Sequence, residues 1–352
     1  MFTIIGFILF IIVLFLFYFT ALSFRKMEIF KNKKSIVAWC LSLIPIIIVF
    51  SFFNTINALI IVIHYALIVI LVNLIMLLFK KKNNNILVLI SVLLTSIYFG
   101  YAAYQAYHIY ETSYDINTQK NVSDFKIIQI SDTHIGATFD GKGFVDHIKK
   151  LSKINADIFV ITGDFIDDDT SKKDMIDACS AFSLLHPKYG IYFVNGNHDR
   201  GYYSRDYSYE DFTNELVKNN VKVLIDEVVD INDEYVLVGR EDMRYSRKDI
   251  KELVSGVDKS KFIIDLNHQP NDYSSEQGVV DLVLSGHTHG GQMFPIQYVS
   301  KLIGVNDETY GLHKIKNTNF IVNSGMSSWA IDFKTGTYSE YVIVNIHGEK
   351  DA

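Results

Sequence analysis

The stretch Gly286-His287-Thr288-His289-Gly290-Gly291-Gln292 directly follows the apolar run Val280 to Leu284. That run has the length and the residues of a buried strand. The two histidines of the stretch lie two positions apart, so both imidazoles point the same way if the backbone stays extended. The glycines around them allow a tight turn and a close approach of backbone. We therefore expect a strand that ends in a polar turn with two imidazoles on one face.

Four other segments repeat this arrangement of an apolar run followed by a polar cluster. The runs are Phe125–Ile130, Ile158–Ile161, Ile191–Val194 and Phe262–Leu266. The clusters that follow them are Ser131-Asp132-Thr133-His134, Gly163-Asp164, Gly196-Asn197-His198-Asp199 and Asn267-His268-Gln269-Pro270. Helical periodicity lies between the runs, in Phe144–Ile154, Lys173–Leu185 and Tyr209–Val217. Alternation of strands and helices predicts an α/β fold, and in such folds ligands bind beyond the carboxyl ends of the strands.

The residue types in these clusters favour a metal site. Five of the chain's 11 histidines lie in the five clusters, together with aspartates and an asparagine. A single histidine is more often structural, but unrelated core histidines would not each follow a strand beside Gly, Asn or Asp. Imidazole and carboxylate ligands with one amide favour manganese, iron or zinc over magnesium. The sequence therefore predicts two divalent ions that share a bridging carboxylate.

At this point residues 125 to 346 resemble the calcineurin-like metallophosphoesterase superfamily. The complete G-H-T-H-G-G-Q from Gly286 to Gln292, with L-N-H-Q-P from Leu266 to Pro270, is similar to its membrane-anchored or exported bacterial branch. The resemblance implies a four-layer α/β/β/α sandwich. It also implies hydrolysis of a phosphoester or pyrophosphate bond by a hydroxide that bridges two metal ions.

The resemblance assigns seven metal ligands in this chain. The first ion takes Asp132, His134 and His289, the second takes Asn197, His268 and His287, and Asp164 bridges them.

The same resemblance implies two catalytic residues that bind no metal. His198 contacts the phosphate and protonates the leaving group, and Asp167 orients that histidine. Arg200 could hold the substrate phosphate, since arginine binds phosphate bidentately, or it could form an ordinary surface salt bridge. The chain departs from the family between Trp329 and Phe333, where relatives tend to carry a proline-rich turn.

The first part of the chain has the composition of a membrane-spanning region. Four apolar stretches, each near the ~20 residues that span a bilayer, predict four transmembrane helices. They are residues 3–24, 36–53, 57–79 and 86–108. We expect a four-helix anchor in residues 1–110, a short tether in 111–124 and the catalytic domain in 125–352.

Loop charges predict the orientation of this anchor. Basic residues gather in two of the connecting loops and are absent from the third, around Asn54. By the positive-inside rule the two basic loops are cytoplasmic, so the catalytic domain faces the extracytoplasmic side of the cell membrane. Tyrosines recur every three residues from Tyr98 to Tyr110. An interfacial aromatic belt explains most of them, and a docking surface for lipid or glycan is the alternative.

Charge and cysteine content limit the possible partners. The formal charge of −6 argues against a nucleic-acid binder with a broad basic face. Only Cys179 lies in the outer domain, so no disulfide framework is expected there. The anchor and short tether favour a phosphorylated lipid or envelope precursor as substrate. Soluble nucleotides or small phosphoesters, and a catalytically silent binding module, are the alternatives; the oligomeric state is not predicted.

Overall fold

The computed structural model describes residues 2–30, 35–80, 83–203 and 205–350. The chain forms two compact units, Met1–Ala103 and Tyr104–Ala352. The division therefore falls a few residues before the expected boundary at residue 110. The loop residues Lys31, Lys33, Lys34, Lys81 and Lys82, on which the predicted orientation depends, lie outside the described residues.

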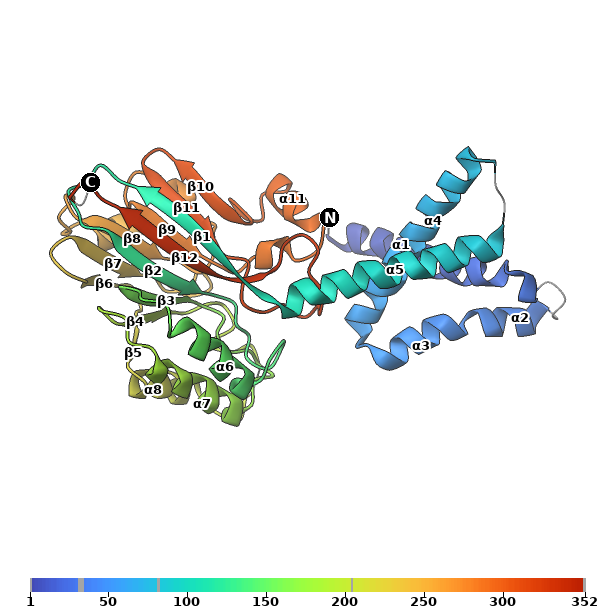
Figure 1. The fold of residues 1–352 in the computed structure, drawn as a ribbon, viewed down its shortest axis with the longest axis horizontal. Coiled ribbons are helices and arrows are strands. Elements are labelled where there is room, and N and C mark those ends of the chain that lie inside the picture. Colours follow the sequence, from blue (N-terminus) through green and yellow to red (C-terminus); the bar gives the residue numbers. More distant parts are fainter. Residues whose placement is uncertain (1, 31–34, 81–82, 204, 351–352) are drawn as a thin grey trace. The chain divides into compact units, whose positions relative to one another are not determined.

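The first unit consists of apolar helices (Figure 1). They are α1 Phe2–Arg25, the short 3-10 helix Glu28–Phe30, α2 Ser35–Ser42, α3 Ile44–Phe52, α4 Thr55–Leu78 and α5 Asn84–Tyr107, which continues into the second unit. The predicted span 36–53 is divided between α2 and α3, with Pro45 in the first turn of α3. Proline has no amide hydrogen and its ring clashes with the preceding turn, so a helix breaks there.

Among the described residues, α4 and α5 are long and apolar enough to cross a membrane. The apolar segments Ile11–Arg25, which is the later part of the 24-residue helix α1, and Ile36–Phe52, which comprises α2 and α3, are shorter than that. Four membrane-spanning helices therefore remain a prediction.

The second unit contains two six-stranded mixed sheets. The first has the order β1-β12-β2-β3-β4-β5 and the second β10-β11-β9-β8-β7-β6. The strands are β1 Ile109–Asn117, β2 Phe125–Ile130, β3 Ile158–Thr162, β4 Ile191–Val194, β5 Val221–Val223, β6 Glu227–Asp230, β7 Tyr235–Gly239, β8 Phe262–Leu266, β9 Leu282–Ser285, β10 Gly311–Ile315, β11 Thr318–Val322 and β12 Ser339–His347. The helices are α6 Gly141–Leu151, α7 Lys172–Ala181, α8 Tyr209–Lys218, α9 Ile250–Leu253, α10 Tyr273–Glu276 and α11 Ile296–Leu302, with 3-10 turns Phe182–Leu184 and His289–Gly291.

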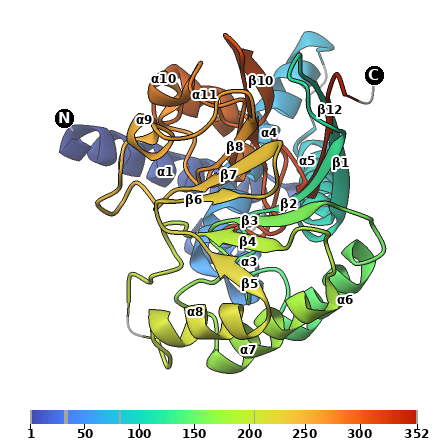
Figure 2. The ribbon, with the colours of Figure 1, turned by 90° about the vertical axis from the view of Figure 1, so that its left-hand side faces the viewer.

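Alternation along the buried strands separates the layers. Ile127 of β2 packs with Leu237 and Leu284 of the second sheet, whereas its neighbour Ile128 packs with Phe144 of α6. Successive side chains of a strand point to opposite faces, so the central strands of each sheet are buried on both faces and are largely apolar. Figure 2 shows α6, α7 and α8 outside the first sheet and α9 and α10 outside the second. The predicted α/β fold is confirmed.

The first half of the segment expected to be a tether, residues 111–117, belongs to strand β1. β1 pairs with β12 in parallel over its whole length, from Ile109 with Ser339 to Asn117 with His347. β1 lies at the edge of its sheet and most of its side chains are exposed or half-buried. Its polar alternation therefore lacked the apolar run by which five of the other strands were predicted. Only residues 118–124 connect β1 to β2.

The strand ends meet as expected. β2, β3 and β4 are parallel neighbours in the first sheet, and β7, β8, β9 and β11 are parallel in the second. Carboxyl ends of parallel strands lie at one edge of a sheet, so the polar clusters after β2, β3, β4, β8 and β9 come together.

Candidate metal centre

The backbone turns sharply at five of the predicted ligands. Asp132, His134, Asp164, His287 and His289 all have positive φ, between 38° and 71°. Residues other than glycine rarely adopt this left-handed conformation, and each costs roughly 1–3 kcal/mol when it is held there. Such outliers cluster at functional sites. The left-handed backbone conformation turns each side chain away from the direction of its strand and toward the other ligands.

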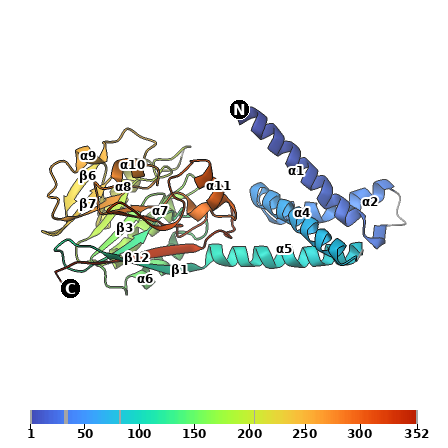
Figure 3. The same cartoon turned by 90° about the horizontal axis from the view of Figure 1, so that it is seen from above.

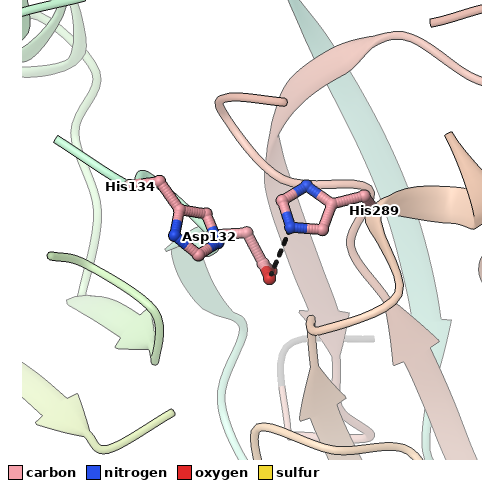
Figure 4. Close-up of side chains that lie close together, drawn as sticks. All are labelled: Asp132, His134 and His289. Atoms are coloured by element: carbon pink, nitrogen blue, oxygen red, sulfur yellow. Dashed lines mark ion pairs between the residues drawn. The ribbon is translucent and has the colours of Figure 1, made fainter. Parts of the chain in front are cut away.

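The first ligand group contains Asp132, His134 and His289, whose ligand atoms all lie within 4.8 Å of one another. Figure 4 shows the His289 ring directed at the Asp132 carboxylate, with 3.5 Å between Nε2 and Oδ1. Asp132 is fully buried and accepts a hydrogen bond from the hydroxyl of Ser131 at 2.6 Å and one from the amide of His287 at 2.9 Å.

The second group contains Asp164, His268 and His287, again with ligand atoms within 4.8 Å. His268 Nε2 lies 3.2 Å from Asp164 Oδ2 and 3.2 Å from the amide oxygen of Asn197. The same oxygen of Asp164 lies 3.7 Å from Nε2 of His134, a member of the first group. Asp164 therefore stands between the two groups, in the position predicted for the bridging carboxylate.

Two backbone carbonyls orient the histidines. Nδ1 of His268 lies 2.8 Å from the carbonyl oxygen of Thr162, and Nδ1 of His289 lies 3.2 Å from that of Ser327. A carbonyl can only accept, so Nδ1 carries the proton and Nε2 keeps the lone pair that a metal needs. The sequence offered no signal for these two carbonyls.

The residues present fit divalent cations. Neither ring nitrogen of the fully buried His134 makes a hydrogen bond of acceptable geometry, although Nδ1 lies 3.1 Å from Asp167 Oδ2. A buried polar atom without a partner is costly unless it binds an ion. Burial lowers the pKa of His289 to about 3, which keeps the neutral form that coordinates metal. Burial also disfavours a charged His268, yet Asp164 raises the pKa of His268 well above its usual value, so this place favours positive charge.

Asp167 joins the predicted acid to a predicted ligand. Its Oδ1 lies 3.0 Å from Nδ1 of His198, and its Oδ2 faces Nδ1 of His134. Burial opposes a charged His198, but the Asp167 contact outweighs it and raises the pKa of His198. Burial likewise opposes ionisation of Asp167, but His134 and His198 lower the pKa of that carboxyl far below its usual range. The predicted pairing of Asp167 with His198 agrees with this geometry, and the contact with His134 was not foreseen.

Asp199 fastens two of the ligand loops together. Its buried carboxylate accepts hydrogen bonds from the amides of Asp164, Phe165, Ile166 and Gly196 at 2.7–3.2 Å. Burial, followed by the charge of Asp164, raises the pKa of Asp199 to about 6. The sequence placed Asp199 inside a cluster without a role. The structure makes it the residue that holds the loop after β3 against the loop after β4.

Arg200 is engaged in contacts away from the ligand groups. Its guanidinium pairs with Glu241 and lies over the rings of Tyr209 and Tyr245, at 4.8 and 4.6 Å from their centroids. This is the salt bridge that the sequence also allowed. A role for Arg200 in holding phosphate stays a prediction.

Arg244, which the sequence did not single out, is exposed at the rim of the site. Its guanidinium lies 3.5 Å from the ring centroid of Tyr202 and donates to the carbonyl of Asn197 at 3.1 Å. The Asn197 side chain donates to the hydroxyl of Tyr202, whose ring lies 5.0 Å from that of His198. The ring of Trp329 lies 5.1 Å from His198. A cation and two aromatic rings thus border the histidine predicted to act as the acid.

The profile of the calcineurin-like phosphoesterase family matches residues 125–291. An uncharacterized metallophosphoesterase of Aquifex aeolicus is 31% identical over 273 residues, which cover 74% of this chain and 99% of the relative. One of Campylobacter jejuni is 31% identical over 249 residues, covering 68% and 63%. A transmembrane protein with metallophosphoesterase domain of Bos taurus is 28% identical over 242 residues, covering 62% and 52%. The chain thus spans under two thirds of the last two relatives.

Three observations agree: the order of the polar strand ends in a two-sheet α/β domain, the two Asp/His groups, and the match that covers 99% of the Aquifex protein. This chain belongs to the calcineurin-like metallophosphoesterase family and is a metal-dependent phosphoesterase.

Proposed function

We propose that this protein is a membrane-anchored hydrolase with two divalent metal ions, acting on a phosphoester or pyrophosphate carried by a lipid-linked or cell-envelope substrate. The observation that carries the chemistry is the position of Asp164 between two Asp/His groups. The apolar helices α4 and α5 support the anchor.

The groups of close ligand atoms support the division of donors that the family resemblance implies. Asp132, His134 and His289 would hold one ion, and Asn197, His268 and His287 the other, with Asp164 shared between them. Imidazole-rich sets of this kind favour manganese, iron or zinc. When bound, two such ions would supply Lewis acidity and lower the pKa of water at the site.

His198 would supply the proton that the leaving group needs. Because Nδ1 of His198 is bonded to Asp167, Nε2 is the nitrogen that remains for substrate. Burial opposes the charged ring, but the Asp167 contact raises its pKa, so the protonated form persists to higher pH than in an ordinary histidine. General acid catalysis of this kind contributes roughly 10²- to 10⁴-fold.

The anchor places the reaction at a membrane. Four spans with both basic loops in the cytoplasm would put the catalytic unit on the extracytoplasmic side. A reporter enzyme fused after residue 110 tests this. We expect activity only from a reporter that works outside the cytoplasm, and cytoplasmic reporter activity would reverse the assignment.

Metal reconstitution tests the chemistry. Full-length protein is stripped of metal and assayed on a chromogenic phosphate monoester and a diester after addition of manganese, zinc, iron or magnesium. We expect turnover to return with one of the first three, and Asp164→Asn to abolish it. Asp146→Asn makes the same chemical change on the exposed face of α6 and should leave turnover intact. No turnover with any metal, in protein that binds metal, would contradict the proposal.

A further inference from the structure

An exposed apolar segment lies next to the metal centre. We call residues 294–305 the α11 segment. Its exposed apolar residues are Phe294, Ile296, Tyr298, Val299, Leu302, Ile303 and Val305. Leu302 is 85% and Ile303 66% exposed, and no residue of α11 is buried. Lys301 is the only charged residue of the segment, and it pairs with Glu308 at 2.6 Å. Contiguous apolar surface of this kind marks a site of contact with protein or membrane.

The polarity of the segment is the reverse of that expected for a helix in water. A surface helix of a soluble domain normally turns its apolar face inward. Here the polar Gln297 faces inward: its backbone and side chain pack on Gly291, its side-chain oxygen packs on Gly336, and its carbonyl accepts from the hydroxyl of Thr309 at 3.0 Å. The large apolar side chains point outward. An apolar environment on the outer side of the segment explains this reversed polarity.

The segment is attached to the catalytic loops. It begins five residues after His289, and the backbone carbonyl of Gln292, just before it, accepts from the amide of Thr335 at 2.8 Å. The side chain of Gln292 donates to the carbonyl of Ile331, in the same loop as Trp329. That loop brings Trp329, which is 43% exposed, to the ring of His198. The α11 segment and the mouth of the site therefore share one edge of the second unit.

The chain enters the second unit at this same edge. β1 runs parallel to β12 from Ile109 opposite Ser339, and β12 is antiparallel to β2. The start of β1 thus lies at the carboxyl end of β2, where Asp132 follows. The hydroxyl of Ser339 also donates to the carbonyl of Ala106 at 2.7 Å. Figures 1 and 3 both show α11 and the start of β1 at the same end of the sheets.

A membrane is the occupant that these observations favour. Tyr104 and Tyr107, at the end of the candidate span α5, are both more than half exposed, and β1 begins two residues after Tyr107. Aromatic residues are enriched where a helix leaves the bilayer. The edge that receives this helix end therefore lies within reach of the membrane surface. Apolar segments with aromatic residues and little charge are suited to insertion at that depth.

We propose that the α11 segment contacts the bilayer and holds the mouth of the metal centre against it, so that the substrate is a phosphoester anchored in the membrane by a lipid chain. The substrate part of this proposal rests on the proposed function. The membrane contact itself does not require turnover, so the two can fail separately.

Fluorescence quenching tests the contact. Full-length Leu302→Trp is placed in phosphatidylcholine nanodiscs with or without bromine on the acyl chains, and the parent signal from Trp39 and Trp329 is subtracted. We expect brominated lipid to quench the added fluorescence. The control Val217→Trp, exposed near the end of α8, should not be quenched. Leu302→Trp fluorescence that brominated lipid leaves unchanged, as when a second copy or another protein covers the segment, overturns the proposal.

Paired substrates test the consequence for catalysis. Ethyl p-nitrophenyl phosphate is soluble, whereas hexadecyl p-nitrophenyl phosphate carries the same bond into the nanodisc. Leu302→Ser with Ile303→Ser should lower the rate on the hexadecyl ester at least about tenfold, since two apolar side chains no longer favour the lipid. The rate on the ethyl ester should not change, nor either rate in the control Val217→Ser with Ile225→Ser. Equal rates on both esters, or equal losses, overturn the substrate assignment. Parent protein inactive with every metal on both esters and on the chromogenic monoester would instead contradict the proposed hydrolase.

Discussion

The two sheets build opposite sides of the metal centre in different ways. Loops of the first sheet carry the acidic residues Asp132, Asp164, Asp167 and Asp199, which contact one another's loops through side chains and amides. Loops of the second sheet supply the imidazoles of His268, His287 and His289, two of which are oriented by backbone carbonyls. The carboxylates of the site thus all come from the first sheet, together with His134, Asn197 and His198, whereas the second sheet supplies only imidazoles. This difference predicts that a substitution in the loops of the first sheet affects more of the site than a substitution in the loops of the second sheet.

Metal content should show the largest contrast. Asp164→Asn removes the carboxylate between the two groups, so bound metal should fall from about two ions toward none. His287→Ala removes a ligand from one group and should leave about one ion. Elemental analysis of purified, metal-loaded variants gives the stoichiometry. Equal metal loss in the two variants would contradict the proposed difference between the two sheets.

Removal of the predicted acid should come next in size. His198→Ala should lower kcat by roughly 10²- to 10⁴-fold on an alkyl phosphate, whose leaving group needs a proton. The loss should be much smaller on a p-nitrophenyl ester, whose leaving group departs without one. Metal content should stay unchanged, because His198 is not among the ligands. A similar loss on both esters would argue that His198 only shapes the site.

Asp167→Asn should have an intermediate effect. The carboxylate contacts both His198 and His134, and loss of such an outer contact typically costs about 10- to 100-fold in activity or metal affinity. The sign of the pH effect follows from the Asp167 contact, which raises the pKa of His198 against the opposing effect of burial. Activity needs protonated His198 and falls as pH rises through that pKa. The variant's pKa is lower, so its alkaline limb should move to lower pH, and a limb at unchanged pH would remove Asp167 from this role.

The smallest effect is expected at Arg244, and it should distinguish Arg244 from Arg200. Arg244, after β7, makes no ion pair among the described residues and lies at the rim, whereas Arg200, after β4, is paired with Glu241. Arg244→Ala should raise KM about tenfold, as expected when one hydrogen bond to a charged phosphate is lost. Arg200→Ala should leave KM near the parent value and lower the thermal midpoint instead. A larger KM effect at Arg200 would restore its predicted role in phosphate binding.

Much of the site could be predicted because its ligands carry local signals. Each of the predicted strands ends in a polar cluster, and the strands after which Asp132, Asp164, Asn197 and His268 follow lie within a residue of their expected bounds. A buried strand must be apolar on both faces, so its end is visible as the first polar residues. The proximity of Asp132 to His289 and of Asp164 to His268 agrees with the assignments that the family resemblance made.

Other parts had no local signal. β1 reads as a polar tether because it is an edge strand with an exposed face, and only pairing with β12 makes it part of the sheet. Every residue type has a backbone carbonyl, so nothing in the sequence marks those of Thr162 and Ser327. Arg244 lies in a loop without regular structure after β7 of the second sheet, and its place beside Tyr202, which follows β4 of the first sheet, depends on how the two sheets pack.

The sequence by itself determined the residue types that can hold metal, their order along the chain and the alternation of buried strands with amphipathic helices. These follow from side-chain chemistry and from periodicity, which are local properties. The tertiary structure decided that Asp167 contacts two histidines at once, that Asp199 holds two ligand loops together, and that the apolar α11 segment is exposed beside the site. Each of these depends on contacts between residues far apart in the chain, and packing of the two sheets sets them.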